Sequence, residues 1–265
     1  MDFYGTVAEH YNEMTNAAQR LSRADRFVAE LAKRFQFRSA LDVACGTGLY
    51  TLALARSGVP HVAGVDLSPE MLAAARRETG SRGFDIAWHQ APMQEVDAVV
   101  PGQWDLILCL GNSIPHLLTG EDLDRTLAAF RRTLSAGGYL GIQLLNYERI
   151  LNRKERIVSI DRHANREFIR FYDFLEETIR FNLLIITWEG DTAHHEIQST
   201  ELYPYREAEL RDALCQHGFG QIQSWDGLSF APYEPGHSQT LLLTAHKPGC
   251  VAGGSGEERA HAEDG

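Results

Sequence analysis

The sequence predicts a doubly wound α/β fold with a mostly parallel, seven-stranded sheet. Between residues 39 and 145, five short apolar segments alternate with helical patterns, as strands and helices do around a parallel sheet. A small-residue loop at 44–48 follows the first apolar segment, and such loops bind nucleotides in α/β proteins. Residues 156–205 contain four strand-like segments without helices, which predicts an antiparallel β-sheet inserted between the fifth strand and the last helix.

The elements of the first half follow from hydrophobic spacing and from helix signals. Apolar residues between 21 and 35 recur at spacings of three, four and seven, which gives one face of a helix. Pro69 fits the first position of a helix that runs to about residue 77. A turn at Ala136-Gly137-Gly138 precedes the fifth strand. We therefore expect strands at 39–43, 62–66, 84–89, 104–110 and 139–145, and further helices from 50 and at 121–134.

In the second half, strand patterns dominate until residue 205. Glu189-Gly190-Asp191 has the composition of a hairpin turn. A helix at 206–218 is ended by Gly218. The inserted strands are expected at 156–162, 166–175, 178–189 and 194–205, and the last two strands of the main sheet at 221–228 and 238–246.

The chain of 265 residues suits one large domain. The last residues are rich in glycine, alanine and acids, and we expect them to be disordered. The expected parts are an N-terminal helical lid at 1–38, a core at 39–155 and 206–248, the inserted sheet at 156–205 and a disordered tail at 249–265.

Composition excludes several classes of partner and site. The net charge of −11 disfavours nucleic acid, whose phosphates need a basic surface. No apolar run approaches the ~20 residues of a transmembrane helix, and no signal peptide is visible. The four cysteines are scattered and match neither a disulfide framework nor a zinc site, so we expect a cytoplasmic protein.

The loop Asp42-Val-Ala-Cys-Gly-Thr-Gly48 predicts a nucleoside cofactor. Gly46 and Gly48 permit positive φ and let a cofactor approach the backbone. A second apolar strand ends at Asp66, 18 residues after Gly48, where a carboxylate can accept both hydroxyls of a ribose. Thr51 stands where a dinucleotide-binding loop has its third glycine, which argues against a pyrophosphate cofactor.

This pattern resembles the class I S-adenosylmethionine-dependent methyltransferases, with Ala44 in place of the first glycine of their loop. Cys109-Leu-Gly-Asn-Ser-Ile-Pro-His-Leu117 and Asn146-Tyr-Glu-Arg-Ile-Leu151 are similar to the glycine N-methyltransferase and glycine/sarcosine methyltransferase branch. The resemblance covers residues 1–151 and implies a Rossmann-like fold with S-adenosyl-L-methionine as cofactor.

The resemblance also implies roles for individual residues. Arg20, or else Arg23, would hold the carboxylate of the cofactor, and Tyr11 would be an aromatic of the lid. Pro92 replaces the usual acid beside adenine, so Met93 or Leu67 would pack against the base. The predicted cofactor-binding residues are Tyr11, Arg20, Asp42, Ala44, Gly46, Gly48, Asp66, Leu67, Met93 and Leu110.

The acceptor side is predicted in the same way. Asn112 would reach the acceptor, and His116 would be either a general base or a buried structural residue. Leu145 stands where glycine N-methyltransferases have an arginine that grips the carboxylate of glycine. We therefore expect glycine to be a poor substrate and the acceptor to present an apolar or neutral group to Leu145, unless another cation substitutes. The candidate substitutes are Arg149, Arg153 and Arg170, Tyr172 is a further candidate for the acceptor pocket, and no metal site is expected.

The sequence thus predicts transfer of a methyl group to a small molecule, with an amine nitrogen as the first choice. The alternatives are O-methylation of a small hydrophobic metabolite, methylation of a protein, and a non-catalytic S-adenosylmethionine-binding protein. A nicotinamide oxidoreductase is disfavoured by Thr51 and by the absence of a Tyr-x-x-x-Lys pair after the fourth strand. We expect the inserted sheet either to arch over the active site or to form a homodimer contact.

Overall fold

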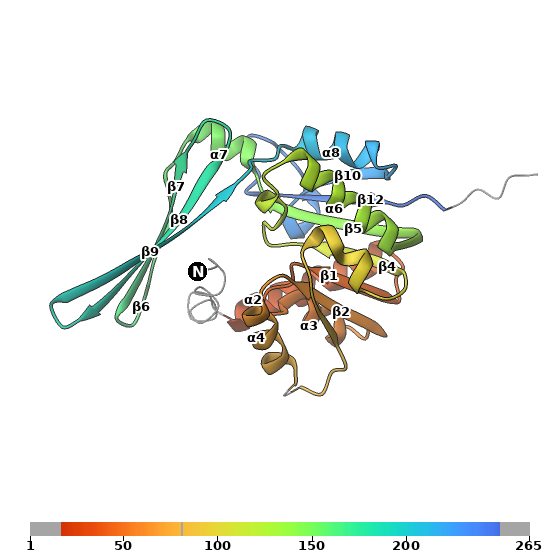
Figure 1. Cartoon of the computed structure of the whole chain (residues 1–265), viewed down its shortest axis with the longest axis horizontal. Helices are drawn as coiled ribbons and strands as arrows, with labels where there is room; N and C mark the ends of the chain where they lie inside the picture. The colour runs from red at the N-terminus through yellow and green to blue at the C-terminus, as the bar shows by residue number, and fades with distance from the viewer. Residues whose placement is uncertain (1–16, 81, 250–265) are drawn as a thin grey trace, which may run out of the picture.

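The computed structural model describes residues 17–80 and 82–249, which form a central sheet with its helices and a separate inserted sheet (Figure 1). Tyr11 and the predicted tail from residue 250 onward lie outside the described residues. The strands of the central sheet are β1 Ser39–Val43, β2 His61–Asp66, β3 Ala87–Gln90, β4 Trp104–Cys109, β5 Leu134–Leu145, β10 Gly220–Asp226, β11 Ala231–Pro232 and β12 Thr240–His246.

Helices connect these strands, and four strands form the insertion. The helices are α2 Ala17–Arg34, α3 Leu49–Arg56, α4 Pro69–Gly80, α5 Val96–Val99, α6 Gly120–Thr133, α7 Tyr147–Arg153 and α8 Glu207–Gln216, with short 3₁₀ turns η1 Met93–Glu95, η2 Ile114–His116 and η3 Gly227–Ser229. The inserted strands are β6 Ile157–His163, β7 Arg166–Phe174, β8 Ile179–Glu189 and β9 Thr192–Leu202.

The central sheet has the strand order β11-β10-β12-β5-β4-β1-β2-β3. The five strands β5-β4-β1-β2-β3 are parallel neighbours, whereas β12 runs antiparallel to β5 and β10 antiparallel to β12. This confirms the predicted doubly wound α/β fold. The sheet has eight strands instead of the predicted seven, because the two residues Ala231 and Pro232 pair with the end of β10.

Some predicted boundaries were wrong. Strand β3 begins at Ala87, three residues later than expected, because its ladder with β2 starts only there. Ile86 ahead of it is apolar because it is buried, not because it is paired. Strand β5 begins at Leu134, and the predicted glycine turn lies inside it as an irregularity: Leu134 pairs with Trp104, but the next pairing joins Leu106 to Tyr139.

The core lies on both faces of the parallel strands. On β4, Leu106 and Leu108 belong to one buried cluster, and Ile107 and Cys109 belong to the other. A strand with both faces covered explains the unbroken apolar run at these positions. The predicted stripe of α2 buries Phe27 in the first of these clusters, so this helix is part of the core.

The inserted sheet has the order β6-β7-β8-β9 and stands beside the carboxyl ends of the parallel strands (Figure 1). The chain leaving β9 is tied to the loop after β4, since the Tyr203 N–H donates to the Pro115 carbonyl at 2.7 Å. The Tyr205 hydroxyl donates to the Leu117 carbonyl, also at 2.7 Å. These bonds fix the inserted sheet relative to the polar loop at 111–117.

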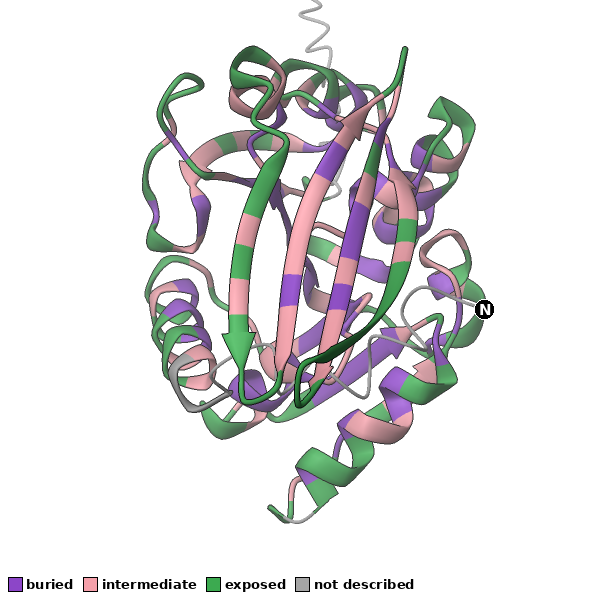
Figure 2. Ribbon diagram, turned by 90° about the vertical axis from the view of Figure 1, so that its left-hand side faces the viewer, coloured by how far each residue is buried: buried purple, intermediate pink, exposed green. Residues whose placement is uncertain are grey.

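The side of the inserted sheet that faces away from the central sheet is uncovered along most of its length (Figure 2). Among the helices of the described chain, none is long and apolar enough to cross a membrane.

Candidate active site

The loop between β1 and α3 has the backbone that a close ligand requires. Ala44, Gly46 and Gly48 have φ angles of 56°, 53° and 78°, which confirms the prediction for the two glycines. The two glycines serve different purposes. A Cβ on Gly46 would meet nothing within 4 Å, whereas a Cβ on Gly48 would lie 2.6 Å from the Trp88 ring. Gly46 therefore leaves space above the loop, and Gly48 lets the loop pack on β3.

Asp42 supports this loop from below. Its side chain is buried, and its Oδ2 accepts a hydrogen bond of 2.6 Å from the hydroxyl of Thr51. Burial raises the pKa of the Asp42 carboxyl to about 7, although the bond from Thr51 lowers it. Thr51, which departs from the dinucleotide pattern, thus ties α3 to the end of β1.

Asp66 joins the loop to the end of β2. Its Oδ2 accepts from the Gly46 N–H at 2.7 Å, and its Oδ1 accepts from the Ser68 N–H at 2.9 Å. The carboxylate therefore holds the backbone of the glycine loop and lines the cavity above it.

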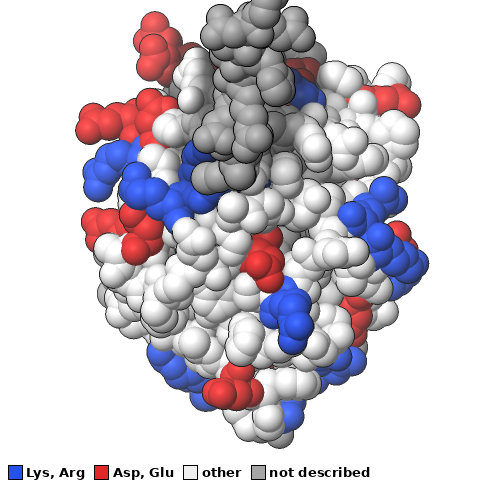
Figure 3. Space-filling model, turned by 90° about the vertical axis from the view of Figure 1, so that its right-hand side faces the viewer, with Lys and Arg blue, Asp and Glu red and all other residues white. Residues whose placement is uncertain are grey.

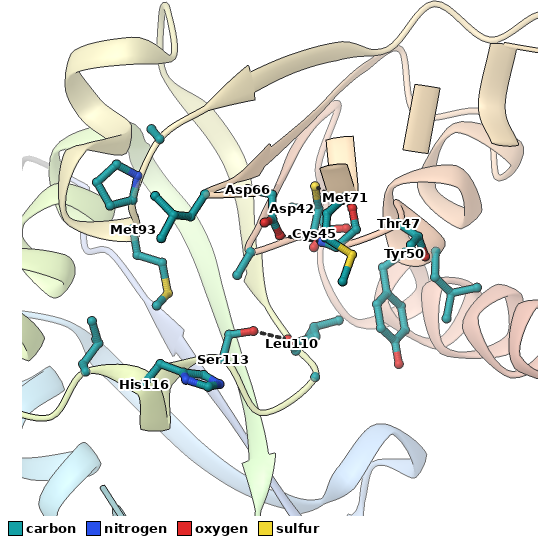
Figure 4. A pocket seen from close by; sticks show the side chains of 18 of the residues that line it. Asp42, Cys45, Thr47, Tyr50, Asp66, Met71, Met93, Leu110, Ser113 and His116 are labelled. Atoms are coloured by element: carbon teal, nitrogen blue, oxygen red, sulfur yellow. Dashed lines mark hydrogen bonds between the residues drawn. The ribbon is translucent and has the colours of Figure 1, made fainter. Parts of the chain in front are cut away.

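A cavity of about 410 Å³ opens over this loop and brings most of the predicted cofactor residues together (Figure 4). Met93 and His116 lie across the cavity from Tyr50 and Thr47. Thr200 of β9 also lines it, so the inserted sheet borders the site, which agrees with the first of the two placements expected from the sequence. The predicted residues that line the cavity are Arg20, Asp42, Ala44, Gly46, Asp66, Leu67, Met93, Leu110 and His116.

Comparisons with known proteins agree with this geometry. A family model described as a methyltransferase domain matches residues 40–138, from β1 into β5. The chain carries a class I S-adenosylmethionine-dependent methyltransferase domain. A glycine/sarcosine N-methyltransferase from Halorhodospira halochloris is 37% identical over 131 residues, which are 49% of this chain and 48% of that relative.

Other similarities extend beyond the methyltransferase domain. A glycine/sarcosine/dimethylglycine N-methyltransferase from Actinopolyspora halophila is 30% identical over 226 residues, 84% of this chain but 39% of that relative. This chain thus spans about half, or less, of the length of these curated relatives. The crystal structure of an S-adenosylmethionine-dependent methyltransferase from Clostridium acetobutylicum superposes with a TM-score of 0.78 at 19% identity, covering 94% of this chain and all of that one. That likeness supports the fold, including the inserted sheet.

The methyltransferase cavity fits its cofactor on structural grounds. A cofactor can lie on the Gly46 backbone, where no side chain intrudes, with the Asp66 carboxylate in reach of ribose hydroxyls. Arg20 lines the cavity and Arg23 does not, which supports Arg20 as the partner of the cofactor carboxylate. Leu67 is 61% exposed at the rim, so an adenine packed there would cover it.

Asn112 does not lie where the sequence led us to expect. It is not among the residues that line the methyltransferase cavity. Its Oδ1 accepts from the Leu145 N–H at 3.0 Å, and its Nδ2 donates to the Tyr147 hydroxyl at 3.0 Å. These two bonds hold the amide at the end of β5, and the φ of Asn112 is 69°, in the left-handed region. This geometry indicates that Asn112 positions the loop after β4 and does not contact the acceptor directly.

Leu145 and Tyr172, the other predicted acceptor residues, also lie outside this cavity. They line a second cavity of about 190 Å³, together with Arg149, Arg153 and Gln239. Tyr172 is only 3% exposed, and burial raises the pKa of its hydroxyl to about 12. Of the acceptor-side residues predicted from the sequence, His116 therefore lines the first cavity, Leu145 and Tyr172 line the second, and Asn112 lines neither.

The cavity has residues that sequence reasoning missed. Thr47 directly follows Gly46, and Tyr50 lies in the first turn of α3, so their closeness to the glycine loop was a signal that could have been used. Thr200 has no local signal, because only the fold brings β9 to the site. Burial raises the pKa of the Cys45 thiol well above its usual range, which favours the protonated form and argues against a role as nucleophile.

Proposed function

We propose that this protein transfers a methyl group from S-adenosylmethionine to a small-molecule acceptor, with an amine nitrogen as the preferred target. One observation carries this proposal: a single cavity joins the glycine loop and Asp66 to His116 and Thr200 on the opposite side. A cofactor seated on the loop would place its reactive end between these groups. Several curated relatives are named N-methyltransferases, which supports nitrogen as the target, whereas two ubiquinone biosynthesis O-methyltransferases are also among them.

Methyl transfer depends mainly on how the protein positions the acceptor relative to the methyl group. When bound, S-adenosylmethionine supplies a methyl group on a positively charged sulfur, which is already activated for displacement. The protein orients the acceptor, and well-oriented reacting pairs reach effective molarities of about 10⁵–10⁸ M. An amine that arrives as an ammonium ion must first lose a proton. His116 is the histidine that lines the cavity, and a base there would add roughly 10²–10⁴-fold to the rate.

The proposal is tested in two stages. Calorimetric titration with S-adenosylhomocysteine and with NAD identifies the cofactor class, and only the first ligand should bind. Transfer of labelled methyl from S-adenosylmethionine to matched amines and phenols then decides between nitrogen and oxygen. His116→Gln should slow transfer to amines about 100-fold or more if the histidine is the base, and should leave cofactor affinity unchanged.

O-methylation of a small hydrophobic metabolite is the second candidate. The apolar side chains of Leu110, Leu117 and Met93 on the cavity wall favour it, because they would accommodate a hydrophobic acceptor. A phenol that is methylated faster than every amine in the screen would select this candidate.

The charge on the surface bears on which partners the protein can bind. Lys and Arg are interspersed with Asp and Glu on the face in Figure 3, without a continuous basic area for a polyanion.

A second copy of the chain is the partner that we propose for the inserted sheet. Its outer face carries a row of aliphatic side chains in register across all four strands: Ile160, Ile169, Leu184 and Ile197.

Two members of this row, Ile160 and Ile197, are 63% and 54% exposed. The charged side chains beside the row come in opposite pairs, since Arg162 lies 3.7 Å from Glu167 and Arg180 lies 3.3 Å from Glu201. Such a face does not repel a copy of itself. Light scattering should therefore report a dimer that Ile197→Glu dissociates, and a monomeric wild type would refute the contact.

A further inference from the structure

The second cavity contains two hydrogen-bond donors without partners in the described chain. The Nε of Arg149 is buried and has no acceptor. The Tyr172 hydroxyl belongs to a side chain that is only 3% exposed, and no described group hydrogen-bonds to it. Buried donors are nearly always satisfied in folded proteins. The Arg149 Nε is such an unsatisfied buried donor, and the Tyr172 side chain lines the same cavity with a hydroxyl that can donate. Together they indicate a place for an acceptor group that comes from outside the chain.

The arrangement of charges identifies the kind of acceptor. Arg149 is anchored by its Nη1, which donates to the Gln239 Oε1 at 3.1 Å. Arg153 and Glu155 also line this cavity, and the 3.9 Å between them makes a weak ion pair, so two arginines face one carboxylate there. A guanidinium and a phenol that donate together match the two oxygens of a carboxylate. Because the chain has a net charge of −11, an anion needs such a local pair of arginines.

The third candidate cation, Arg170, is already engaged. Its Nη1 donates to the Ser159 hydroxyl at 2.8 Å and also contacts the Asp161 carboxylate. Arg170 is therefore occupied within the inserted sheet, whereas the Arg149 Nε is not. Of the three arginines that could replace the one missing at Leu145, Arg149 is the one that the geometry makes available.

The second cavity lies next to the cofactor cavity. Gly111 and Ser113, after β4, line the first cavity, and Leu145, at the end of the neighbouring β5, lines the second. Asn112 bridges them through its bond to the Leu145 N–H. Strands of the inserted sheet border both cavities, because Thr200 of β9 lines the first and Tyr172 of β7 lines the second. Among the described residues, none lines both cavities.

We propose that the second cavity is the subsite for a carboxylate of the methyl acceptor, with Arg149 as its main cation and Tyr172 as its second donor. This inference rests on the proposed function and narrows its substrate class. Since the cavities share no wall residue, the amine and the carboxylate of the acceptor are several bonds apart. The intervening chain passes Leu145, which agrees with the expectation of an apolar group there. Glycine is too short to satisfy both ends.

The test uses ω-amino acids of increasing length and the matching plain amines. Protein saturated with S-adenosylhomocysteine is titrated calorimetrically with glycine, 4-aminobutyrate and 6-aminohexanoate, and with butylamine and hexylamine. We expect one of the longer amino acids to bind about tenfold or more tightly than glycine and than its own plain amine. Arg149→Gln should reduce that preference to about threefold or less, and Tyr172→Phe should weaken it severalfold.

The control variant is Arg77→Gln, which changes an exposed arginine of α4 and should preserve the preference. S-adenosylhomocysteine affinity is measured for every variant, and it should be unchanged in Arg149→Gln and Tyr172→Phe. If the wild type does not bind S-adenosylhomocysteine, the proposed function itself fails. If it binds that ligand but carboxylated and plain amines bind equally, the subsite is wrong. A preference that survives Arg149→Gln would also overturn the assignment.

Discussion

Asp66 and Asp105 form a natural pair for testing the cofactor site. The Asp66 carboxylate accepts two backbone N–H groups, from Gly46 at 2.7 Å and Ser68 at 2.9 Å. The Asp105 carboxylate also accepts two, from Arg38 at 2.8 Å and Ser39 at 3.1 Å. Asp66 ends β2, whereas Asp105 is near the beginning of β4, so the two lie at opposite edges of the parallel sheet.

Changing either aspartate to alanine removes two charge-assisted hydrogen bonds. Each such bond is worth about 1.5–3 kcal/mol, and water replaces part of it at a half-buried site. We therefore expect both variants to lower the free energy of unfolding by about 2–4 kcal/mol. Only Asp66→Ala would also lose the ribose contacts that we propose and the support of the glycine loop, so it alone should weaken cofactor binding by at least about tenfold, or about 1.4 kcal/mol.

Urea denaturation gives the loss of stability, and calorimetric titration with S-adenosylhomocysteine gives the affinity at a temperature where both variants are folded. Asp105→Ala should bind the ligand within about twofold of the wild type. Equal affinity of Asp66→Ala and the wild type would refute the ribose assignment. An equal loss of affinity in both variants would show that the effect comes from stability alone.

Three further predictions concern residues around the cavity. Burial raises the pKa of the Asp42 carboxyl to about 7 from an ordinary 3.8. Its contribution to the free energy of unfolding is therefore complete below about pH 4 and falls by about 4 kcal/mol as the pH rises to about 7. Asp42→Asn should therefore gain stability over the wild type from pH 5 to pH 8 in urea denaturation, and a constant difference would contradict this. Gly64→Ala would place a Cβ 2.5 Å from the indole of the next strand and should cost about 1–3 kcal/mol, while Gly120→Ala, with open space, should change the melting temperature little. Arg20→Ala should weaken binding of S-adenosylmethionine more than binding of methylthioadenosine, which lacks the carboxylate. The control variant Arg23→Ala should change the affinity for neither ligand. If Arg20→Ala weakens both ligands equally, the carboxylate role is excluded.

The sequence by itself determined the fold class and the cofactor loop. The buried positions of β4 are all apolar, on both faces of the sheet. This pattern is visible in the sequence without knowing which helices cover the strand. Gly46 and Gly48 revealed their conformation in the same way, because positive φ is a property of a single residue. The place of Asp66 on the cavity was predictable because it is the last residue of its strand, and the carboxyl ends of parallel strands meet at one edge.

Tertiary structure alone decided how the acceptor side is divided. Asn112 reads as a site residue in the sequence, yet its amide is bonded to Leu145, 33 residues further along. Thr200 and Tyr172 reach the cavities only because the inserted sheet is held there by bonds between distant segments, such as that from Tyr203 to Pro115. Local patterns record whether a side chain is buried and which conformation its backbone prefers. They do not record which distant groups meet across a cavity, because that depends on how whole elements pack.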